Sequence, residues 1–183
     1  MIDQNDIQKI KEAVEEFLDK MTITSYAVIA TLGQDKAKTK RTSEDVLNFS
    51  VLTAEPQEKE ESENNDTVNV DITLGDPQIL IGERGQTLFE AQKLLKTVLN
   101  KKLKKYFYLN LDINDYKRKK IDYLRSIAKT LADDVAITKH EKVLIPMSAF
   151  ERRVIHTELS QRPDIATESQ GQGEDRCVVI KPR

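Results

Sequence analysis

The sequence predicts an α+β protein built from two small domains, one over residues 1–113 and one over residues 114–183. Three observations predict this class. Helical and strand patterns in the first part follow the order helix, strand, strand, helix, helix, strand. A Gly-x-x-Gly turn separates the two neighbouring helical patterns of that series. A new helical pattern then begins at Asn114 and opens a second series, and 183 residues suffice for two small domains.

A helix and a strand open the first domain. Apolar residues recur at helical spacing on one face, namely Ile7, Ile10, Val14, Phe17, Leu18 and Met21. Residues 25–32 are β-branched and apolar and end at Gly33, which predicts a strand. An acidic insertion follows at about residues 34–66. Within it, residues 46–53 alternate well enough for a further strand, while residues 34–43 and 55–66 are polar and predict loops.

The remainder of the first domain contains the glycine turn. Residues 68–74 alternate between apolar and polar, which predicts a half-exposed strand. Asp76 is expected to cap a short helix that has Pro77 at its first position. A longer helix is predicted over residues 88–103, where apolar residues recur and lysines follow, and residues 106–113 form the clearest strand pattern of the chain.

The second domain begins with Asn114, the expected N-cap of a helix that runs to about Val135. Four cations at residues 117–120 oppose the dipole of that helix, which suggests another use for them. Residues 142–145 predict a short strand. A capping box from Ser148 to Glu151 opens a helix that reaches about Ser160, and strands are predicted over residues 165–169 and 176–180.

Charge is distributed unevenly along the chain. The net charge of −2 combines −7 over residues 1–66, +2 over residues 67–113 and +3 over residues 114–183. The basic remainder removes the objection that an acidic protein should not bind nucleic acid. Cys177 is the single cysteine, is expected in the core and cannot form an intramolecular disulfide, and no apolar run has signal or membrane length. We therefore expect a cytoplasmic protein with no membrane partner.

The glycine turn is the first candidate site. Glycines permit positive φ and let a ligand approach the backbone, and the helix start behind them offers N–H groups to an anion. The sequence Ile81-Gly82-Glu83-Arg84-Gly85 resembles the signature loop of the KH domain, a single-stranded RNA-binding module. The resemblance implies that these five residues contact RNA, although Glu83 repels phosphate and Arg84 only partly offsets it. We expect the bases to lie across an apolar groove made by residues such as Ile79, Ile81 and Leu88. The alternative is that the glycines serve turn geometry alone.

Arg152, Arg153 and His156 form the second candidate site, because Arg152 and His156 lie four apart on one predicted helix. A guanidinium can fork onto phosphate oxygens, and an imidazole can donate a hydrogen bond or stack on a base. The Arg-x-x-x-His pattern after a serine helix start resembles the R-three-H domain, a small single-stranded nucleic-acid-binding fold. Residues 146–153, 167–169 and 178–182 extend the likeness. The alternative is a surface pair with Glu151 or Glu158.

A KH-like loop followed by an Arg-x-x-x-His helix resembles the bacterial Jag (KhpB) family. The resemblance implies a type II KH-like domain (α-β-β-α-α-β) followed by a small α/β R-three-H domain. It also implies binding of single-stranded RNA, in post-transcriptional regulation or RNA chaperoning, with single-stranded DNA as an alternative ligand and another KH-domain protein as a candidate partner. We expect the family's N-terminal Jag domain to be absent, and the acidic insertion departs from the family pattern.

Enzyme classes find little support in the sequence. No Cys/His metal spacing, Gly-x-Ser-x-Gly or P-loop motif occurs, so we expect no catalytic residues, no metal and no cofactor. Two other classes stay open. One is an interaction module that docks on a ribosome- or division-associated protein. The other, with less support, is a phosphodiesterase in which His156 would need a partner that the sequence does not supply.

Overall fold

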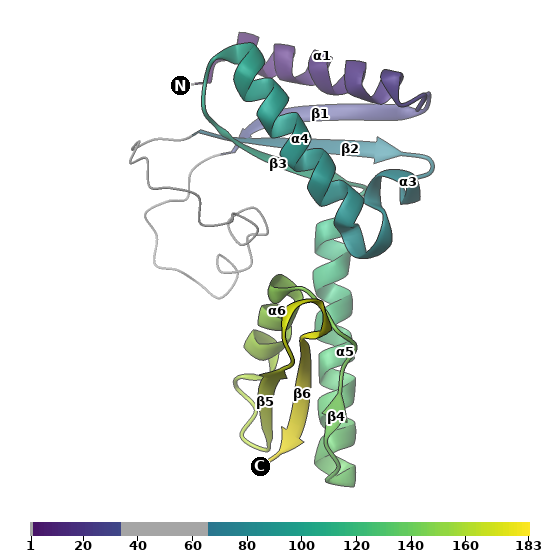
Figure 1. Cartoon of the computed structure of the whole chain (residues 1–183), viewed down its shortest axis with the longest axis vertical. Helices are drawn as coiled ribbons and strands as arrows, with labels where there is room; N and C mark the ends of the chain where they lie inside the picture. The colour runs from purple at the N-terminus through teal and green to yellow at the C-terminus, as the bar shows by residue number, and fades with distance from the viewer. Residues whose placement is uncertain (1, 34–65) are drawn as a thin grey trace. The chain divides into compact units, whose positions relative to one another are not determined.

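The computed structural model describes residues 2–33 and 66–183, which form two compact units (Figure 1). Unit 1 comprises residues 2–33 and 66–117, and unit 2 comprises residues 118–183. The predicted strand over residues 46–53 and the predicted loop over residues 34–43 lie outside the described residues, as does the acidic stretch up to residue 65.

Unit 1 is a three-stranded sheet with helices, in the predicted order. Its elements are α1 (Gln4–Lys20), β1 (Tyr26–Gly33), β2 (Thr67–Leu74), α3 (Gln78–Ile81), the 3-10 turn η2 (Glu83–Gly85), α4 (Gln86–Leu103) and β3 (Tyr108–Ile113). The strand order is β1-β2-β3, with β1 and β2 antiparallel and β2 and β3 parallel. The α+β class and the type II KH-like element order are thus confirmed.

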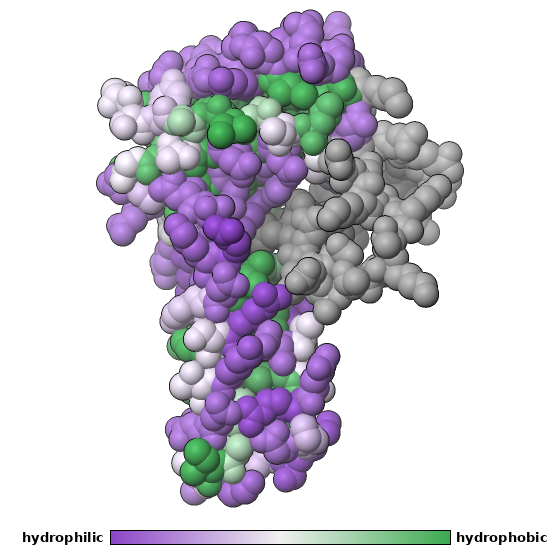
Figure 2. Space-filling model, turned by 180° about the vertical axis from the view of Figure 1, so that it is seen from behind, coloured by the Kyte–Doolittle hydropathy of each residue, from purple (hydrophilic) through white to green (hydrophobic). Residues whose placement is uncertain are grey.

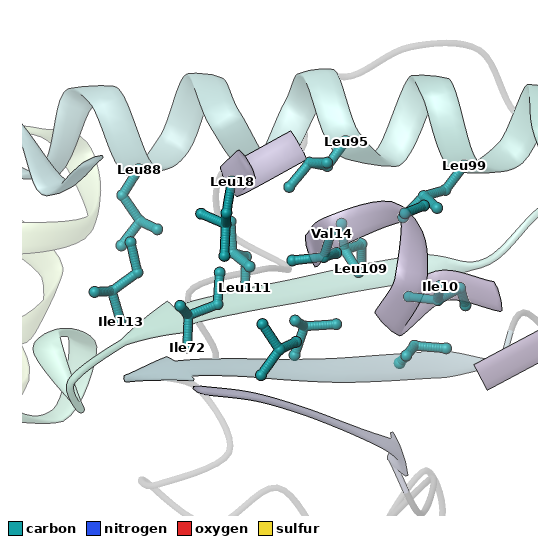
Figure 3. Packing of buried hydrophobic residues seen from close by; sticks show 14 of the residues in the cluster. Ile10, Val14, Leu18, Ile72, Leu88, Leu95, Leu99, Leu109, Leu111 and Ile113 are labelled. Carbon is teal, nitrogen blue, oxygen red and sulfur yellow. The ribbon is translucent and has the colours of Figure 1, made fainter. Parts of the chain in front are cut away.

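The core of unit 1 lies between the helices and one face of the sheet (Figure 3). Strand β2 shows the predicted alternation, because every second residue from Val68 to Leu74 is buried. Helix α1 contributes Ile10, Val14 and Leu18, each fully buried. Side chains of α4 and β3 complete the cluster, namely Leu88, Leu95, Leu99, Leu109, Leu111 and Ile113. This packing holds the start of α4, and with it the glycine turn, on the sheet.

The helix after Asn114 begins at Tyr116, so Asn114 is not the residue directly before it, which corrects the predicted N-cap position. Its side-chain Oδ1 accepts from the Leu74 N–H at 2.9 Å, and its Nδ2 donates to the Leu74 carbonyl at 2.8 Å. Its own N–H donates to the carbonyl of Ile72 at 3.0 Å. Asn114 therefore closes the end of β2. Asp112 fulfils the capping role instead, because its Oδ1 accepts from the Lys117 N–H at 3.2 Å at the start of α5 (Tyr116–Thr138).

The expected cap of the short helix α3 is also displaced by one residue. The N-cap is Pro77, and the helix begins at Gln78. The carboxylate of Asp76 still accepts from the Gln78 N–H, at 3.4 Å. Proline suits either position because it has no N–H to satisfy. The shift leaves the position of the glycine turn unchanged.

Lys117 is half-buried, and its ammonium group forms hydrogen bonds with polar side chains of unit 1. Its Nζ donates to Asn110 Oδ1 at 2.7 Å and to Gln92 Oε1 at 3.0 Å, and the same Gln92 oxygen accepts from the Leu111 N–H at 3.1 Å. Burial lowers the pKa of Lys117 to about 8, against the opposing effect of Asp112. The other use that the sequence suggested for this cation is therefore a buried network linking α4, β3 and α5.

Replacing Lys117 by Met is expected to change how stability depends on pH. The folded protein gives up the Lys117 proton near pH 8, whereas the unfolded chain keeps it to about 10.5. The unfolded state therefore binds more protons between these values, so this residue's contribution to stability rises with pH. We expect the unfolding free energy of the wild type, relative to Lys117→Met, to rise by about 1–2 kcal/mol over that range.

Denaturant unfolding at several pH values measures this difference, and Lys119→Met at an exposed lysine is the matched control. A constant difference between the wild type and Lys117→Met would contradict the assignment.

Unit 2 packs two helices on a three-stranded sheet. The rest of α5 is followed by β4 (Lys142–Val143), α6 (Ala149–Leu159), β5 (Ile165–Gln170), the 3-10 turn η3 (Gly173–Asp175) and β6 (Cys177–Pro182). The strand order is β4-β6-β5, and both pairs are antiparallel. The strand expected over residues 142–145 is only two residues long, although Leu144 still donates its N–H to the Val178 carbonyl at 2.9 Å. Cys177 is buried, as the sequence predicted.

Polar residues cover most of the surface seen in Figure 2, with smaller hydrophobic areas between them. The exposed apolar side chains include Ile29, Ile79, Tyr106, Ile137 and Ile145, each more than half exposed. No helix in the described parts of the chain is long and apolar enough to cross a membrane.

Candidate nucleic-acid interface

The glycine turn of unit 1 has a backbone that only glycine adopts readily. Gly82 lies at φ 69° and ψ −174°, and Gly85 at φ 90° and ψ 11°. Arg84 between them is also left-handed, at φ 54°. The Gly85 N–H donates to the Gly82 carbonyl at 3.4 Å and closes the turn. The turn thus reverses the chain between α3 and α4 within four residues.

Both glycines are also required by packing. A Cβ on Gly82 would lie 1.9 Å from Thr87 Oγ1 and 2.6 Å from Thr87 Cβ. A Cβ on Gly85 would lie 2.8 Å from Cε1 of Tyr116. Gly85 is buried, whereas Glu83 and Arg84 are exposed. The glycines therefore build the turn, and the two residues between them are the ones that a ligand can reach.

The apolar residues expected to line a base-binding groove beside the turn are mostly part of the core. Leu88 is 1% exposed, so its predicted contact with bases is wrong. Ile81 is half-buried and packs against the core of unit 1. Only Ile79, at 64% exposed, offers a free apolar surface. The sequence pattern could not separate these residues, because Ile79 and Ile81 belong to one unbroken apolar run with Leu80, and Leu88 is followed by Phe89.

Helix α4 begins directly behind the turn and presents its positive end there. Its N-cap is Gly85, no side chain caps it, and its first turn contains no acid. An 18-residue helix with this start favours an anion near its first N–H groups. Glu83 is exposed, so its carboxylate lies at the surface of the turn.

Lysines farther along α4 have partners within unit 1. Lys102 pairs with Glu16 of α1 at 3.4 Å, and Lys105 pairs with Asp6 and lies 3.9 Å from Asp3. Lys96 sits over the Tyr108 ring, 5.1 Å from its centroid. This basic run therefore helps to fasten α1 and β3 to α4.

Helix α6 of unit 2 is positioned by its first turn. Ser148 and Glu151 form the predicted capping box, with the Ser148 N–H donating to Glu151 Oε2 at 2.8 Å. Glu151 is 7% exposed and pairs with Lys120 of α5 at 3.0 Å. Val154 and Ile155 are buried beneath the helix. The alternative interpretation, a pairing of Arg152 or His156 with Glu151 or Glu158, is not found among the described residues; instead Glu158 pairs with Arg125 and Lys129.

Arg152 and His156 turn toward strand β5 and meet two hydroxyls there. His156 Nδ1 lies 2.7 Å from Thr167 Oγ1, and His156 Nε2 lies 2.8 Å from Ser169 Oγ. Arg152 Nη1 donates to the same Ser169 oxygen at 3.2 Å. We call these four residues the hydroxyl cluster. Arg153 is exposed beside it and is not part of it.

Positive charge accumulates at the hydroxyl cluster. Burial lowers the pKa of Arg152, and neighbouring Arg176 lowers it further. Burial also lowers the pKa of His156, with Arg152 adding to the effect. Among the described residues, Arg152 Nε is buried and has no hydrogen-bond partner. Burial and a neighbouring cation thus lower both pKa values. The cations are held close together and partly shielded from water, so a bound anion would relieve their repulsion.

Three residues near the second site were not among the sequence-based candidates: Thr167, Ser169 and Arg176. The segment containing Thr167 and Ser169 entered only as part of the family likeness. Two hydroxyl residues two apart on a predicted strand lie on one face, which is the signal that could have identified them. Arg176 follows the η3 turn, and nothing in its local sequence pointed to Arg152.

The described residues contain no group of three or more His, Cys, Asp or Glu side chains that could hold a metal ion. His140, the second histidine of the chain, is exposed after α5, with its Nδ1 2.7 Å from the carbonyl oxygen of Thr138.

The fold and the hydroxyl cluster agree with comparisons to known proteins. Residues 122–182 match the R-three-H domain family, so unit 2 places this chain among the proteins that carry an R-three-H domain. Outside this domain, the chain is similar to proteins of the Jag (KhpB) family.

Three curated relatives share one name. The chain is 37% identical over 137 residues to an RNA-binding protein KhpB of Clostridium symbiosum, a match covering 74% of this chain and 60% of the relative. It is 38% identical over 120 residues to the RNA-binding protein KhpB of Bacillus subtilis (strain 168), covering 64% of this chain and 58% of the relative. The chain thus spans about three fifths of the length of these two relatives. A Lactiplantibacillus plantarum protein of the same name is 32% identical over 117 residues, covering 64% of this chain and 36% of the relative.

Proposed function

We propose that this chain binds single-stranded RNA through two separate surfaces, the hydroxyl cluster with Arg153 and Arg176 in unit 2 and the glycine turn in unit 1. Similarity to the curated relatives supports the proposal, since these are named RNA-binding proteins. One structural observation carries it. Within the described residues, Arg152, Arg153 and Arg176 form no ion pair, although acids are plentiful in the chain.

The contrast with Arg125 and Arg162 of unit 2 makes this observation informative. Arg125 pairs with Glu158, and Arg162 pairs with Asp133 and Asp164. Paired arginines stabilise the fold, whereas clustered arginines without acids cost stability through their repulsion. A phosphate oxygen would accept from such guanidinium groups in the bidentate geometry that arginine favours. Backbone phosphates of a single strand are the ligand that this chemistry fits.

The glycine turn would contribute a second phosphate contact. Its backbone N–H groups and the first turn of α4 would bind phosphates, with Arg84 adding charge. Ile79 offers an exposed apolar surface on which a base could lie. Two weak surfaces on one chain bind one strand more tightly than either alone, because the second contact becomes intramolecular. We extend the proposal to a role in post-transcriptional regulation or RNA chaperoning and to a partner with a KH domain, as the resemblance to the Jag (KhpB) family implies.

A salt-titrated binding assay with a short single-stranded oligouridylate tests the proposal. Arg153→Gln and Arg176→Gln remove charge from exposed positions, so the fold should persist. We expect the pair of substitutions to weaken binding about tenfold, and the slope of log K against log salt to fall by about 0.7 for each phosphate that the protein no longer neutralises. Lys181→Gln is the matched control in unit 2, since Lys181 pairs with Glu168 at 2.7 Å.

Unit 1 is tested with Arg84→Gln, using Lys93→Gln at an exposed position of α4 as its control. We expect a weakening of about threefold to tenfold from Arg84→Gln alone. Equal binding by the wild type and all of these variants would contradict the proposal, and so would an absence of binding. Binding of oligodeoxyuridylate with equal affinity would broaden the ligand class to single-stranded DNA.

A further inference from the structure

The hydrogen-bond geometry of the hydroxyl cluster constrains where its hydrogens can point. Arg152 Nη1 can only donate, so Ser169 Oγ must accept at that contact of 3.2 Å. Ser169 then has one hydrogen and one lone pair left. These can serve His156 Nε2, which lies 2.8 Å from Ser169 Oγ, and a bound ligand. Thr167 Oγ1 lies 2.7 Å from the other ring nitrogen of His156, Nδ1.

In a neutral imidazole one ring nitrogen donates and the other accepts. One of the two hydroxyls must therefore use its hydrogen on the ring. If Nε2 accepts, the hydrogen of Ser169 points at His156 and cannot reach a ligand. If Nδ1 accepts, the hydrogen of Thr167 is used in the same way. Protonation makes both nitrogens donors, so both hydroxyls accept from the ring and both hydrogens become free.

We propose, on the basis of the RNA binding proposed above, that Ser169 and Thr167 are phosphate-binding hydroxyls whose hydrogens are both available to phosphate oxygens only when His156 has taken up a proton. Binding of a backbone phosphate and protonation of His156 then favour each other. The phosphate gains a hydroxyl donor and a nearby positive charge, and the imidazolium gains an anion.

The charged groups around His156 agree with this coupling. On α6, Arg152 acts on it directly, and Arg153 is exposed nearby. Strand β5 presents Thr167 and Ser169 to the ring, while Glu168 pairs with Lys181 of β6. The charges between α5 and α6 are paired, with Glu158 meeting Arg125 and Lys129 and with Glu151 meeting Lys120. Arg176 acts on Arg152. The groups that interact with His156 are therefore cations and hydroxyls.

The sign of the pH dependence follows from these neighbours. Burial and Arg152 lower the pKa of His156 in the free protein, which favours the neutral ring. A bound phosphate opposes both effects and raises that pKa. Affinity should therefore increase as pH falls, by about fivefold to tenfold between about pH 7.5 and pH 5.5. An oligouridylate without terminal phosphates suits the test, because neither uracil nor a phosphodiester titrates in that range.

The experiment combines binding with direct observation of the histidines. The chain contains two histidines, so His140, which is exposed, serves as the internal control in an NMR titration. Oligouridylate should raise the titration midpoint of His156 and leave that of His140 unchanged. Calorimetry in two buffers with different heats of ionisation should show proton uptake on binding.

Variants separate the roles of the three residues. His156→Gln keeps a hydrogen-bonding side chain that cannot titrate, so its binding should no longer depend on pH. Ser169→Ala should weaken binding at low pH by about threefold or more, and Ser169→Thr should restore part of the affinity. The melting temperature of each variant reports whether unit 2 remains folded, and Thr167→Val removes the second hydroxyl with a milder expected effect.

Several results would overturn the proposal. Wild-type affinity that is constant over this pH range would do so while leaving the proposed RNA binding intact. Unchanged pH dependence in His156→Gln, or wild-type affinity in both folded hydroxyl variants, would have the same meaning. A lack of binding at every pH would instead overturn the RNA-binding function itself, and this inference with it.

Discussion

Gly82→Ala is expected to destabilise unit 1 by about 3 kcal/mol or more. Two costs combine at this position. The backbone at φ 69° and ψ −174° lies in a region that is almost restricted to glycine, and the added Cβ would lie 1.9 Å from Thr87 Oγ1. Relief would require Thr87 to move, but its backbone belongs to the first turn of α4. Denaturant unfolding followed by circular dichroism, with amide exchange in unit 1, measures the effect.

Three other glycines make this prediction selective. Gly85→Ala should cost about 2–4 kcal/mol, because φ is 90° and the Cβ would lie 2.8 Å from the Tyr116 ring. Gly173→Ala isolates the backbone cost, about 1 kcal/mol, since φ is 55° and no atom lies within 4 Å. Gly75→Ala lacks both costs, with Ser25 Oγ 4.0 Å away. A Gly82→Ala protein as stable as Gly173→Ala would show that the turn adapts.

This prediction also determines how the glycine turn should be tested for binding. Substitutions of either glycine would lower RNA affinity through misfolding, whether or not the turn touches RNA. Arg84 and Glu83 are exposed, so changes there leave the turn intact. Glu83→Gln removes the acid that opposes phosphate and should strengthen binding if the turn contacts RNA.

Glu151→Ala is expected to destabilise unit 2 by about 2–4 kcal/mol. The carboxylate is 7% exposed, accepts from the Ser148 N–H at 2.8 Å and pairs with Lys120 at 3.0 Å. Its removal leaves both donors without that acceptor, and the side chain of Lys120 is only 22% exposed. Thermal and denaturant unfolding measure the effect, and RNA binding should fall with it because α6 carries Arg152 and His156.

Two variants divide this cost between the cap and the ion pair. Ser148→Ala removes only the hydroxyl half of the capping box, worth about 1 kcal/mol. Glu151→Gln keeps an acceptor for the Ser148 N–H but removes the charge facing Lys120, so an intermediate destabilisation is expected. If Glu151→Ala proved no worse than Ser148→Ala, the ion pair with Lys120 would contribute nothing to stability.

Local sequence patterns predicted most of the elements and both candidate motifs. Helical spacing located α1, α4 and α5, alternation located β2, and the Ser148–Glu151 pattern located the start of α6. These features depend on residues within a few positions of one another, so the sequence alone reveals them. The glycine turn was identified for the same reason: positive φ at closely spaced positions is a local requirement that few residues other than glycine meet.

The tertiary structure decided which side chains meet. Asn114 matched a helix cap in the sequence, yet it bonds to Leu74, forty residues away. Leu88 matched a groove residue but lies in the core. Ser169 and Thr167 come within hydrogen-bond distance of His156 only because β5 packs beside α6. Such contacts join residues distant in the chain, and their energies depend on burial and on neighbouring charge, which no local pattern contains.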